Sequence, residues 1–527
     1  MADKIPFTLD DLYITLKKHD KDILAHFNDD KLSDDDYLFY AIFSDIVSNA
    51  LSIVANIFID NESSVGVDNN ARSIIEGFVI LKMLKNGDIS ENQQKIFRNH
   101  FAVVEYENFK WLIKQQPDNP VIVEMKKRYD DAVKFLCEFY GCKKNVLKQH
   151  YYGDPLFYLK KSLNDDIKFV TLLKKYPIFN EDSLRAYDFY SIMIHPRFAD
   201  SEVFETALLD LKKKYNRLIL NYLVEILKSN KLIVIDKNAN TFADDFYKNP
   251  ILVNNVANIQ QIDVAFAMLA VDLCKLKEGE DVFTLFFLKT ISSLVKDMML
   301  SETLGYNEQV ISKYKSFIEL AAVSARINCA ESQDEFKILK RAFALSSKLQ
   351  LEEHFRAMNI SEKTEYDELK DLYESYYKRK YSIPTLEEFQ KGMRSNSLYF
   401  LNPKESKNYN YYVKNTIYEL FSDENRRIEL FEMYKLSKDM NHASGYNFNS
   451  CPGVPEFYSH LVMHAVYTWL INFVIHATAV VEKMDHKTKY TQTFLDGLKV
   501  FADLENNYME EIGNKQREEY NNLTFAK

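Results

Sequence analysis

Two short patterns in the sequence place a basic residue four positions before a glutamate, inside an apolar stretch. Arg72 and Glu76 belong to ARSIIEGFVILKML. Lys315 and Glu319 belong to YKSFIELAAVSARI. Residues four apart share one face of a helix, so each pair can form an ion pair. A pair buried among apolar side chains needs further polar partners, which predicts either a structural network or a functional site.

A tyrosine, a serine and a histidine follow each pattern further along the chain. Their side chains can form hydrogen bonds with the donors and acceptors that the ion pair of a basic residue and a glutamate does not use. We expect the better-formed cluster in the first half, made of Arg72, Glu76, Tyr190, Ser191 and His195. The expected second-half equivalents are Lys315, Glu319, Tyr434, Ser437 and His442.

The chemistry that such a cluster can support is acid–base catalysis at a phosphate. An arginine stabilises developing negative charge, and a histidine moves a proton. The catalytic residues would be Arg72, Glu76 and His195. Helical ribonucleases of the higher-eukaryote and prokaryote nucleotide-binding type use an Arg-x4–6-His spacing, which this sequence lacks. Serine-hydrolase chemistry is disfavoured because the sequence has no nucleophile elbow.

Two more histidines, His460 and His464, lie four apart in an apolar run at 457–481. This spacing binds zinc in His-Glu-x-x-His proteases, but the glutamate of that motif is missing here. Buried, hydrogen-bonded histidines are therefore favoured, and we predict no metal and no other cofactor. The run is long enough to cross a bilayer, although its histidines and Asn472 would be costly in lipid. This favours a buried central helix in a soluble protein.

The composition predicts an all-α protein. Among 527 residues there are 12 glycines and 11 prolines, well below the usual shares of about 7% and about 5%. Folds rich in strands need these residues at many tight turns. Helical periodicity predicts helices near 36–59, 68–86, 92–116, 121–140, 202–229, 281–300, 308–330, 333–349, 364–380, 385–393 and 455–484. Asp68-Asn69-Asn70 is the expected start of the second of these helices.

The order of the features predicts two related helical bundles in tandem. Each basic–glutamate pattern is followed by an acidic, tyrosine-rich segment, then by the histidine and a long apolar helix. The first bundle would cover 1–230 and the second, diverged bundle 263–527. Residues 231–262 would form the junction. Within it, the segment 231–236 (KLIVID) is the best candidate for a short strand.

Charge and cysteine content indicate a cytoplasmic protein. The net charge of −10 does not broadly attract nucleic acid or acidic membranes, although it leaves room for a local basic patch. The five cysteines are odd in number and include no Cys-x2-Cys pair, which disfavours a disulfide framework and a cysteine zinc site. The N-terminus lacks the apolar segment of a signal peptide. We expect a protein partner or a small ligand, and the oligomeric state stays open.

The basic-x3-Glu and Tyr-Ser-x3-His patterns resemble a large bacterial family of helical proteins that is known as a domain of unknown function. The first expected cluster matches that pattern at every position. The second departs from it, because Lys315 replaces the arginine and Ser437 lies five residues before His442. The resemblance implies a helical bundle, here in tandem, and no established activity. It also suggests a role in bacterial stress or phage defence.

Two functions follow from these observations. The first is a non-catalytic helical module that binds a partner or a small ligand. The second is a helical, nuclease-like effector that acts on RNA through Arg72, Glu76 and His195. The missing Arg-x4–6-His spacing and the acidic charge favour the first. Convergence of Arg72 and His195 at a solvent-accessible place would favour the second.

Overall fold

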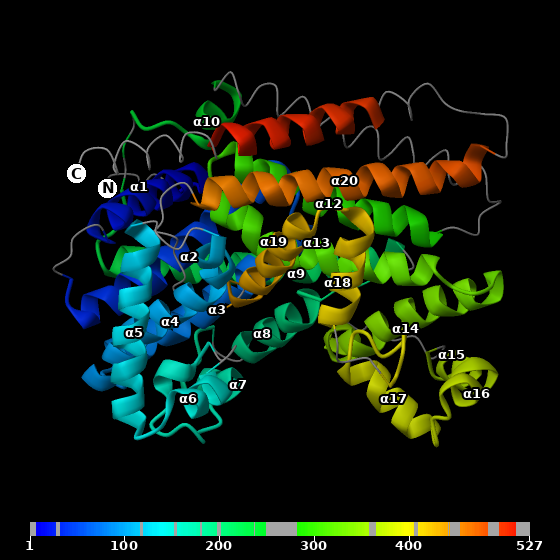
Figure 1. The fold of residues 1–527 in the computed structure, drawn as a ribbon, viewed down its shortest axis with the longest axis horizontal. Helices are drawn as coiled ribbons and strands as arrows, with labels where there is room; N and C mark the ends of the chain where they lie inside the picture. Colours follow the sequence, from blue (N-terminus) through cyan, green and yellow to red (C-terminus); the bar gives the residue numbers. More distant parts are fainter. Residues whose placement is uncertain are drawn as a thin grey trace, which may run out of the picture.

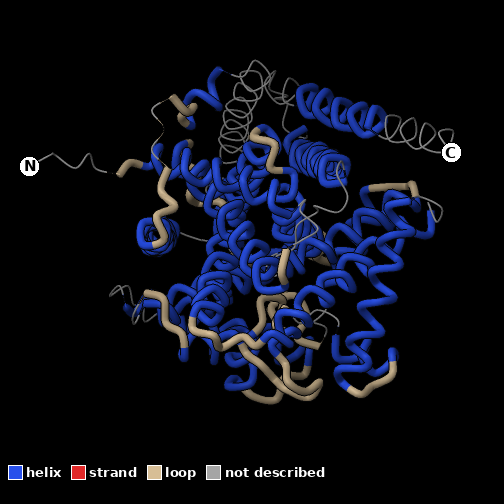
Figure 2. The backbone as a smooth tube through the Cα atoms, turned by 90° about the vertical axis from the view of Figure 1, so that its left-hand side faces the viewer, coloured by secondary structure: helices blue, strands red, loops and turns tan. Residues whose placement is uncertain are grey.

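A computed structural model describes residues 7–27, 32–115, 120–151, 155–179, 182–195, 197, 202–234, 236, 238–248, 282–357, 365–404, 409–440, 442, 454–482 and 495–512. Figure 1 shows these residues as helices joined by turns and loops. The view turned by 90° in Figure 2 contains no strand among them. The all-α prediction is therefore confirmed for the described residues.

The elements of the first half are α1 (Leu9–Phe27), α2 (Asp34–Phe58), α3 (Val65–Lys85), α4 (Glu91–Gln115), α5 (Pro120–Tyr140), α6 (Lys144–Tyr151), the 3₁₀ turn η1 (Phe157–Leu159), α7 (Phe169–Lys175), α8 (Asp182–Met193), α9 (Glu202–Ser229) and α10 (Phe242–Lys248). Helices are present at each range that periodicity indicated in this half. The short helix α8, which ends just before His195, was not among them.

The elements of the second half are α12 (Val282–Thr303), α13 (Asn307–Asn328), α14 (Gln333–Ala357), α15 (Glu365–Leu372), the π-helical turn η2 (Tyr373–Tyr377), α16 (Lys378–Tyr381), α17 (Leu386–Ser395), α18 (Tyr409–Leu420), α19 (Glu424–Met440) and α20 (Val454–Glu482). A further helix covers residues 495–512. In Figure 1 α1 to α6 lie on one side of the molecule and α14 to α17 on the other.

The central helices α3 and α13 pack against each other and carry the two basic–glutamate pairs. The start of α3 corrects the sequence prediction. Ser64 caps the helix by accepting a hydrogen bond from the Gly66 backbone, so the helix begins before Asp68. The Asp68 carboxylate is instead buried and lies 2.7 Å from Lys212 Nζ. Asn69 donates a hydrogen bond to Ser316 at 2.8 Å, across to α13.

Two clusters of buried apolar side chains form the core, and they follow the halves of the sequence only approximately. The cluster dominated by the first half also contains Leu300, Leu351 and Phe355. The cluster dominated by the second half also contains Phe101 and Met125. Packing therefore crosses the expected boundary in both directions. The division into two related bundles stays a prediction.

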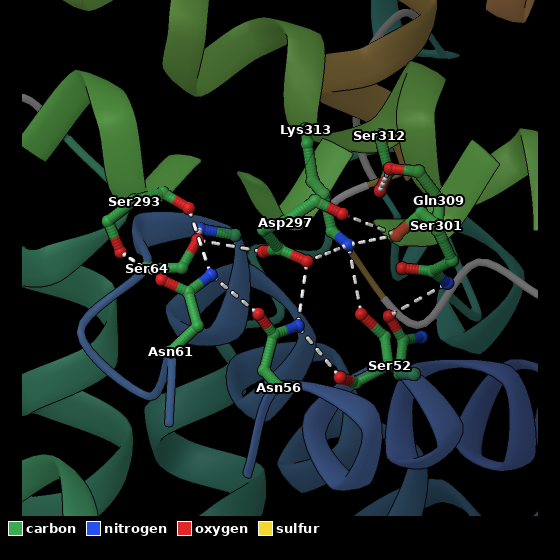
Figure 3. Close-up of polar contacts among 12 residues, drawn as sticks. Ser52, Asn56, Asn61, Ser64, Ser293, Asp297, Ser301, Gln309, Ser312 and Lys313 are labelled. Carbon is green, nitrogen blue, oxygen red and sulfur yellow. Dashed lines mark hydrogen bonds and ion pairs between the residues drawn. The ribbon is translucent and has the colours of Figure 1, made fainter. Parts of the chain in front are cut away.

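A buried ion pair of the second half accepts hydrogen bonds from, and donates one to, side chains of the first half, as Figure 3 shows. Asp297 of α12 and Lys313 of α13 contact each other with both side chains fully buried, and burial lowers the pKa of Lys313. The Asp297 carboxylate accepts hydrogen bonds from Asn56 at 2.7 Å and from Ser64 at 2.8 Å. Lys313 also donates to Ser52 at 2.9 Å. These bonds compensate much of the cost of burying two charges.

The strand expected at 231–236 is wrong for the described residues of that segment, which form a turn and a loop. Side chains of α1 contact backbone carbonyl groups that would pair with a neighbouring strand in a sheet. Thr15 donates a hydrogen bond to the Val234 carbonyl at 3.1 Å. His19 Nε2 lies 2.6 Å from the Leu232 carbonyl oxygen. The apolar side chains of this segment thus pack against helices without a partner strand.

The apolar run at 457–481 lies within α20, which packs against α13. Its described side chains include Leu461, Val466 and Leu470, all buried. Among the described residues, one helix is long and apolar enough to cross a membrane, the segment Asp36–Phe58, and 78% of its apolar window is buried inside the protein. Length and apolar composition are shared by core helices of soluble proteins, so this is weak evidence for a span. Solubility and a cytoplasmic location stay predictions.

Candidate functional site

Glu76 on α3 lies at the centre of a polar cluster. Arg72 Nε lies 3.2 Å from its carboxylate, in the expected ion pair. The Tyr187 hydroxyl donates a hydrogen bond to Glu76 at 3.1 Å and accepts one from Arg72 at 3.4 Å. Burial opposes the charge of Arg72, but Glu76 and Tyr187 outweigh it and raise the pKa of the guanidinium. The arginine therefore stays charged inside the protein.

Glu319 on α13 has closely matching surroundings. Lys315 Nζ lies 3.8 Å from its carboxylate, and the Tyr434 hydroxyl donates a hydrogen bond to it at 3.1 Å. Burial alone would raise the pKa of Glu319, but Lys315 and His195 lower it on balance. Burial lowers the pKa of Lys315. The second half thus holds a carboxylate that is buried, charged and paired, like Glu76.

Each glutamate is also approached by a histidine from the other half of the sequence. His442 Nδ1 lies 3.3 Å from the Glu76 carboxylate. His195 Nδ1 lies 3.6 Å from the Glu319 carboxylate. Because α8 packs on α3 and α19 packs on α13, each tyrosine contacts the glutamate of its own half. The sequence-based grouping of His195 with Glu76 therefore differs from the structure, which exchanges the two histidines.

The exchange follows from the length of α8 and α19. Tyr187 precedes His195 by eight residues, and Tyr434 precedes His442 by the same number. The six residues from each tyrosine to the end of its helix rise about 9 Å, and the histidine lies further on, so a tyrosine and its histidine reach different partners. Both histidines lie two residues beyond the last residue of their helix. This equal spacing is the sequence signal that would have identified Tyr187.

The remaining residues of the expected clusters lie outside this arrangement. The Tyr190 hydroxyl donates a hydrogen bond to Asn216 at 2.7 Å. The Ser191 hydroxyl is buried and makes no hydrogen bond to the described residues. The Ser437 hydroxyl donates to the Tyr434 carbonyl of its own helix at 2.8 Å. Tyr190 and the serines are therefore part of the supporting structure, and Tyr187 takes the place expected for Tyr190.

Positive charges gather where the two clusters meet. Burial lowers the pKa of Lys315 and the Glu319 charge raises it. The charges of Arg72, Lys438 and Arg197 lower it further. Lys315 Nζ is weakly bound, with its hydrogen bond to the Ile194 carbonyl at 3.4 Å. Like charges that oppose one another in a poorly hydrated place are stabilised by nearby negative charge, here that of Glu319. Four basic side chains therefore act on the region where the two glutamates lie.

Both imidazoles reach solvent, although the glutamates do not. The His195 side chain is 35% exposed and that of His442 is 28% exposed, whereas Glu319 is 2% exposed. The His195 ring stacks on Tyr409, with ring centroids 5.7 Å apart. Its Nδ1 atom makes no hydrogen bond to the described residues. Partial burial and the Lys315 charge lower the pKa of His195 to about 4, so this imidazole is neutral near pH 7 and can accept a proton.

Arg72 and His195 both lie near Lys315, because the charge of Arg72 lowers the pKa of Lys315 and the charge of Lys315 lowers the pKa of His195. The fold and the site together define an all-helical protein with a composite, partly exposed histidine–carboxylate site. Comparison with known proteins adds no relative: no family model, no curated protein and no solved structure matches the chain.

Proposed function

We propose that the protein is a helical, nuclease-like effector that cleaves phosphodiester bonds in RNA. One observation carries this proposal: the exchanged histidines bring two partly exposed imidazoles to the region where Arg72 and Lys315 lie. This arrangement supports an enzyme over a binding module, because Arg72 and the partly exposed His195 both lie near Lys315. It also extends the expected catalytic set from one histidine to two.

The two imidazoles can divide the proton transfers of RNA cleavage between them. Neutral His195 accepts the proton of a ribose 2′-hydroxyl as that oxygen forms a bond to phosphorus. His442 donates a proton to the 5′-oxygen as its bond to phosphorus breaks. The Glu76 carboxylate, 3.3 Å from His442 Nδ1, orients that ring. Arg72 and Lys315 stabilise the charge that builds on the phosphate oxygens. RNA is the substrate class because its 2′-hydroxyl supplies the nucleophile.

A non-catalytic module that binds an anionic ligand or a partner is the second candidate. It is favoured by the net charge of −10 and by the enclosure of Arg72, whose side chain is 13% exposed and already paired with Glu76. Whether the protein is a nuclease or a binding module, the proposal includes three further points. These are kinship with the bacterial helical family, a tandem origin of the halves, and a role in stress or phage defence.

The direct test measures cleavage of a fluorescent RNA oligonucleotide by the purified protein and by the variants His195→Ala and His442→Ala. Loss of a general acid or base lowers rates by about 10²- to 10⁴-fold. We expect each variant to lose at least about 10²-fold in rate while it remains folded, which its melting curve shows. His464→Gln is the matched control, because His464 lies on α20 and belongs to neither glutamate cluster.

The outcomes separate the two candidates. If the parent protein binds RNA or inorganic phosphate without cleaving RNA, and His195→Ala or Lys315→Gln weakens that binding, the binding module is supported. If the parent protein neither binds nor cleaves, the nuclease and the anion-binding form of the module are both contradicted. If both histidine variants cleave as fast as the parent, the assignment of these residues is wrong.

A further inference from the structure

A second histidine–carboxylate cluster lies between three helices that are distant in sequence. Glu302 comes from α12, His460 from α20 and Glu505 from the helix at 495–512. His460 Nδ1 lies 2.7 Å from the Glu505 carboxylate and 3.2 Å from the Glu302 carboxylate. One potential ligand atom from each of the three lies within 4.8 Å of the other two. The cluster is not part of the paired glutamate site, and its interpretation does not depend on the proposed function.

The hydrogen bonds of this cluster leave one carboxylate oxygen over. A single proton on His460 Nδ1 can be donated fully to one acceptor, and Glu505 is the closer one. Glu302 Oε1 is buried and lies 3.2 Å from His460 Nδ1, but it makes no well-aligned hydrogen bond to the described residues. A buried carboxylate oxygen that its neighbouring donor does not fully satisfy is costly, so it indicates that a further group belongs there.

The charges point to a divalent cation as that group. When both carboxylates are ionised they carry a charge of −2, and a protonated His460 cancels only half of it. The side chains are only 14% exposed for His460, 15% for Glu302 and 9% for Glu505, so water screens the remainder poorly. A divalent ion bound by the two carboxylates and a neutral imidazole would balance the charge completely.

The donor set selects the kind of ion. One imidazole nitrogen with two carboxylate oxygens suits transition metals such as zinc, whereas magnesium and calcium prefer oxygen ligands alone. The Tyr508 ring stacks on His460 with ring centroids 5.1 Å apart and holds the imidazole in place. Three protein ligands leave at least one coordination position for water or another ligand, as catalytic zinc sites do.

We propose that Glu302, His460 and Glu505 bind a divalent transition-metal ion of the zinc type. The ion would join α12, α20 and the helix at 495–512. Because zinc–ligand distances are about 2.0–2.2 Å, the three donor atoms must move slightly apart to admit the ion. The sequence pairs His460 with His464 at a spacing of four, but His464 is not one of the three clustered residues.

The test begins with the full-length protein, stripped with a chelator and titrated with Zn²⁺ by calorimetry. We expect one equivalent of Zn²⁺ to bind through this cluster and to raise the melting temperature, since an ion that binds the folded state stabilises it. Mg²⁺ at the same concentration should produce no comparable shift. Glu302→Gln and Glu505→Gln should each weaken this binding by at least tenfold.

His464→Gln is the matched control, since it changes a histidine one turn away on the same helix and should leave the affinity unchanged. Melting temperatures in chelator show whether each variant is folded. If Glu505→Gln does not fold, the partly exposed Glu302→Gln provides the same test. The proposal is overturned if Zn²⁺ neither binds to the parent protein nor shifts its melting temperature. Full affinity in a folded carboxylate variant would overturn it as well.

Discussion

Glu76 and Glu319 are carboxylates whose charge is maintained almost entirely by other protein groups. Each has a basic residue four positions earlier, a tyrosine hydroxyl at 3.1 Å and a histidine from the other half of the sequence. Removing one member of such a set leaves another charge buried and unpaired, which costs more than the pair contributes in net terms. The residues of the candidate site are therefore also part of its structural support.

We expect Glu76→Gln to lower the free energy of unfolding by about 3–5 kcal/mol, because the Arg72 guanidinium then stays buried without its carboxylate. Urea unfolding followed by circular dichroism measures the change. Glu419→Gln is the control, since Glu419 is exposed on α18, and it should change stability by less than about 0.5 kcal/mol. Equal stability of the two variants would show that the Arg72–Glu76 pair contributes little to the fold.

The histidine that approaches Glu319 should titrate unusually low. We expect His195 in the folded protein to remain neutral down to about pH 5 and to titrate near its lowered pKa of about 4. The charged groups around it are Lys315 and Glu319 of α13 and Arg197 of its own segment. Lys315→Gln should raise the pKa, because the ammonium no longer opposes the imidazolium. NMR of labelled histidine measures both values, and a pKa near 6.5 in the parent protein would contradict this assignment.

This shift also has a consequence for stability. The unfolded chain binds a proton at His195 near pH 6.5, whereas the folded protein binds it only near pH 4. Between these values the unfolded state carries more protons, so the contribution of His195 to stability falls as the pH drops through this window. Above about pH 6.5 that contribution is fully present.

At the scale of elements, the first turn of α3 depends on the absence of a side chain at position 66. A Cβ atom on Gly66 would lie 2.1 Å from Asp297 Oδ2 and 3.0 Å from the Lys313 side chain. The glycine therefore lets α3 approach the buried ion pair that joins α12 and α13. The close packing of α3 and the position of the Asp297–Lys313 pair therefore depend on each other.

We expect Gly66→Ala to destabilise the protein by about 1–3 kcal/mol, because overpacking displaces the buried ion pair. This loss exceeds the gain of about 1 kcal/mol that alanine usually brings to a helix. Gly497→Ala is the control, since a Cβ there meets nothing within 4 Å in the helix at 495–512. It should be neutral or stabilising. Thermal unfolding of both variants decides, and equal melting temperatures would contradict the close packing at Gly66.

At the scale of the whole molecule, the exchange of histidines makes each cluster depend on both halves of the chain. His442 contacts Glu76 although 366 residues separate them in sequence. The Asp297 carboxylate likewise accepts a hydrogen bond from Asn56, 241 residues away. Neither half contains all the partners of its own glutamate. The site can therefore form only when the two halves are packed together.

A double-mutant cycle tests this exchange. Glu76→Gln and His442→Gln should show a coupling energy of about 0.5–3 kcal/mol in unfolding experiments, because the two side chains interact directly. Glu319→Gln and His442→Gln form the control cycle, and their effects should add to within about 0.5 kcal/mol. Stronger coupling of His442 with Glu319 than with Glu76 would mean that each histidine serves its own half.

Much of the helical architecture was readable in the sequence because helices are local. The periodic spacing of apolar residues reports which face of a segment is buried, and it needs no knowledge of the partner. It indicated α2, α3, α13 and α20 close to their observed bounds. The scarcity of glycine and proline excluded folds rich in tight turns. The Arg72–Glu76 pair was equally readable, since four residues place both side chains on one helical face.

Only the tertiary structure decided which partners meet. Local spacing could not show that His195 approaches Glu319 and that His442 approaches Glu76, because this depends on how α8 and α19 lie across α3 and α13. The cluster around His460 likewise unites three segments whose order in sequence carries no sign of their contact. Helix formation is governed by neighbours in the chain, whereas a polar cluster is governed by neighbours in space. The sequence alone therefore determined the helices of this protein, and packing determined its sites.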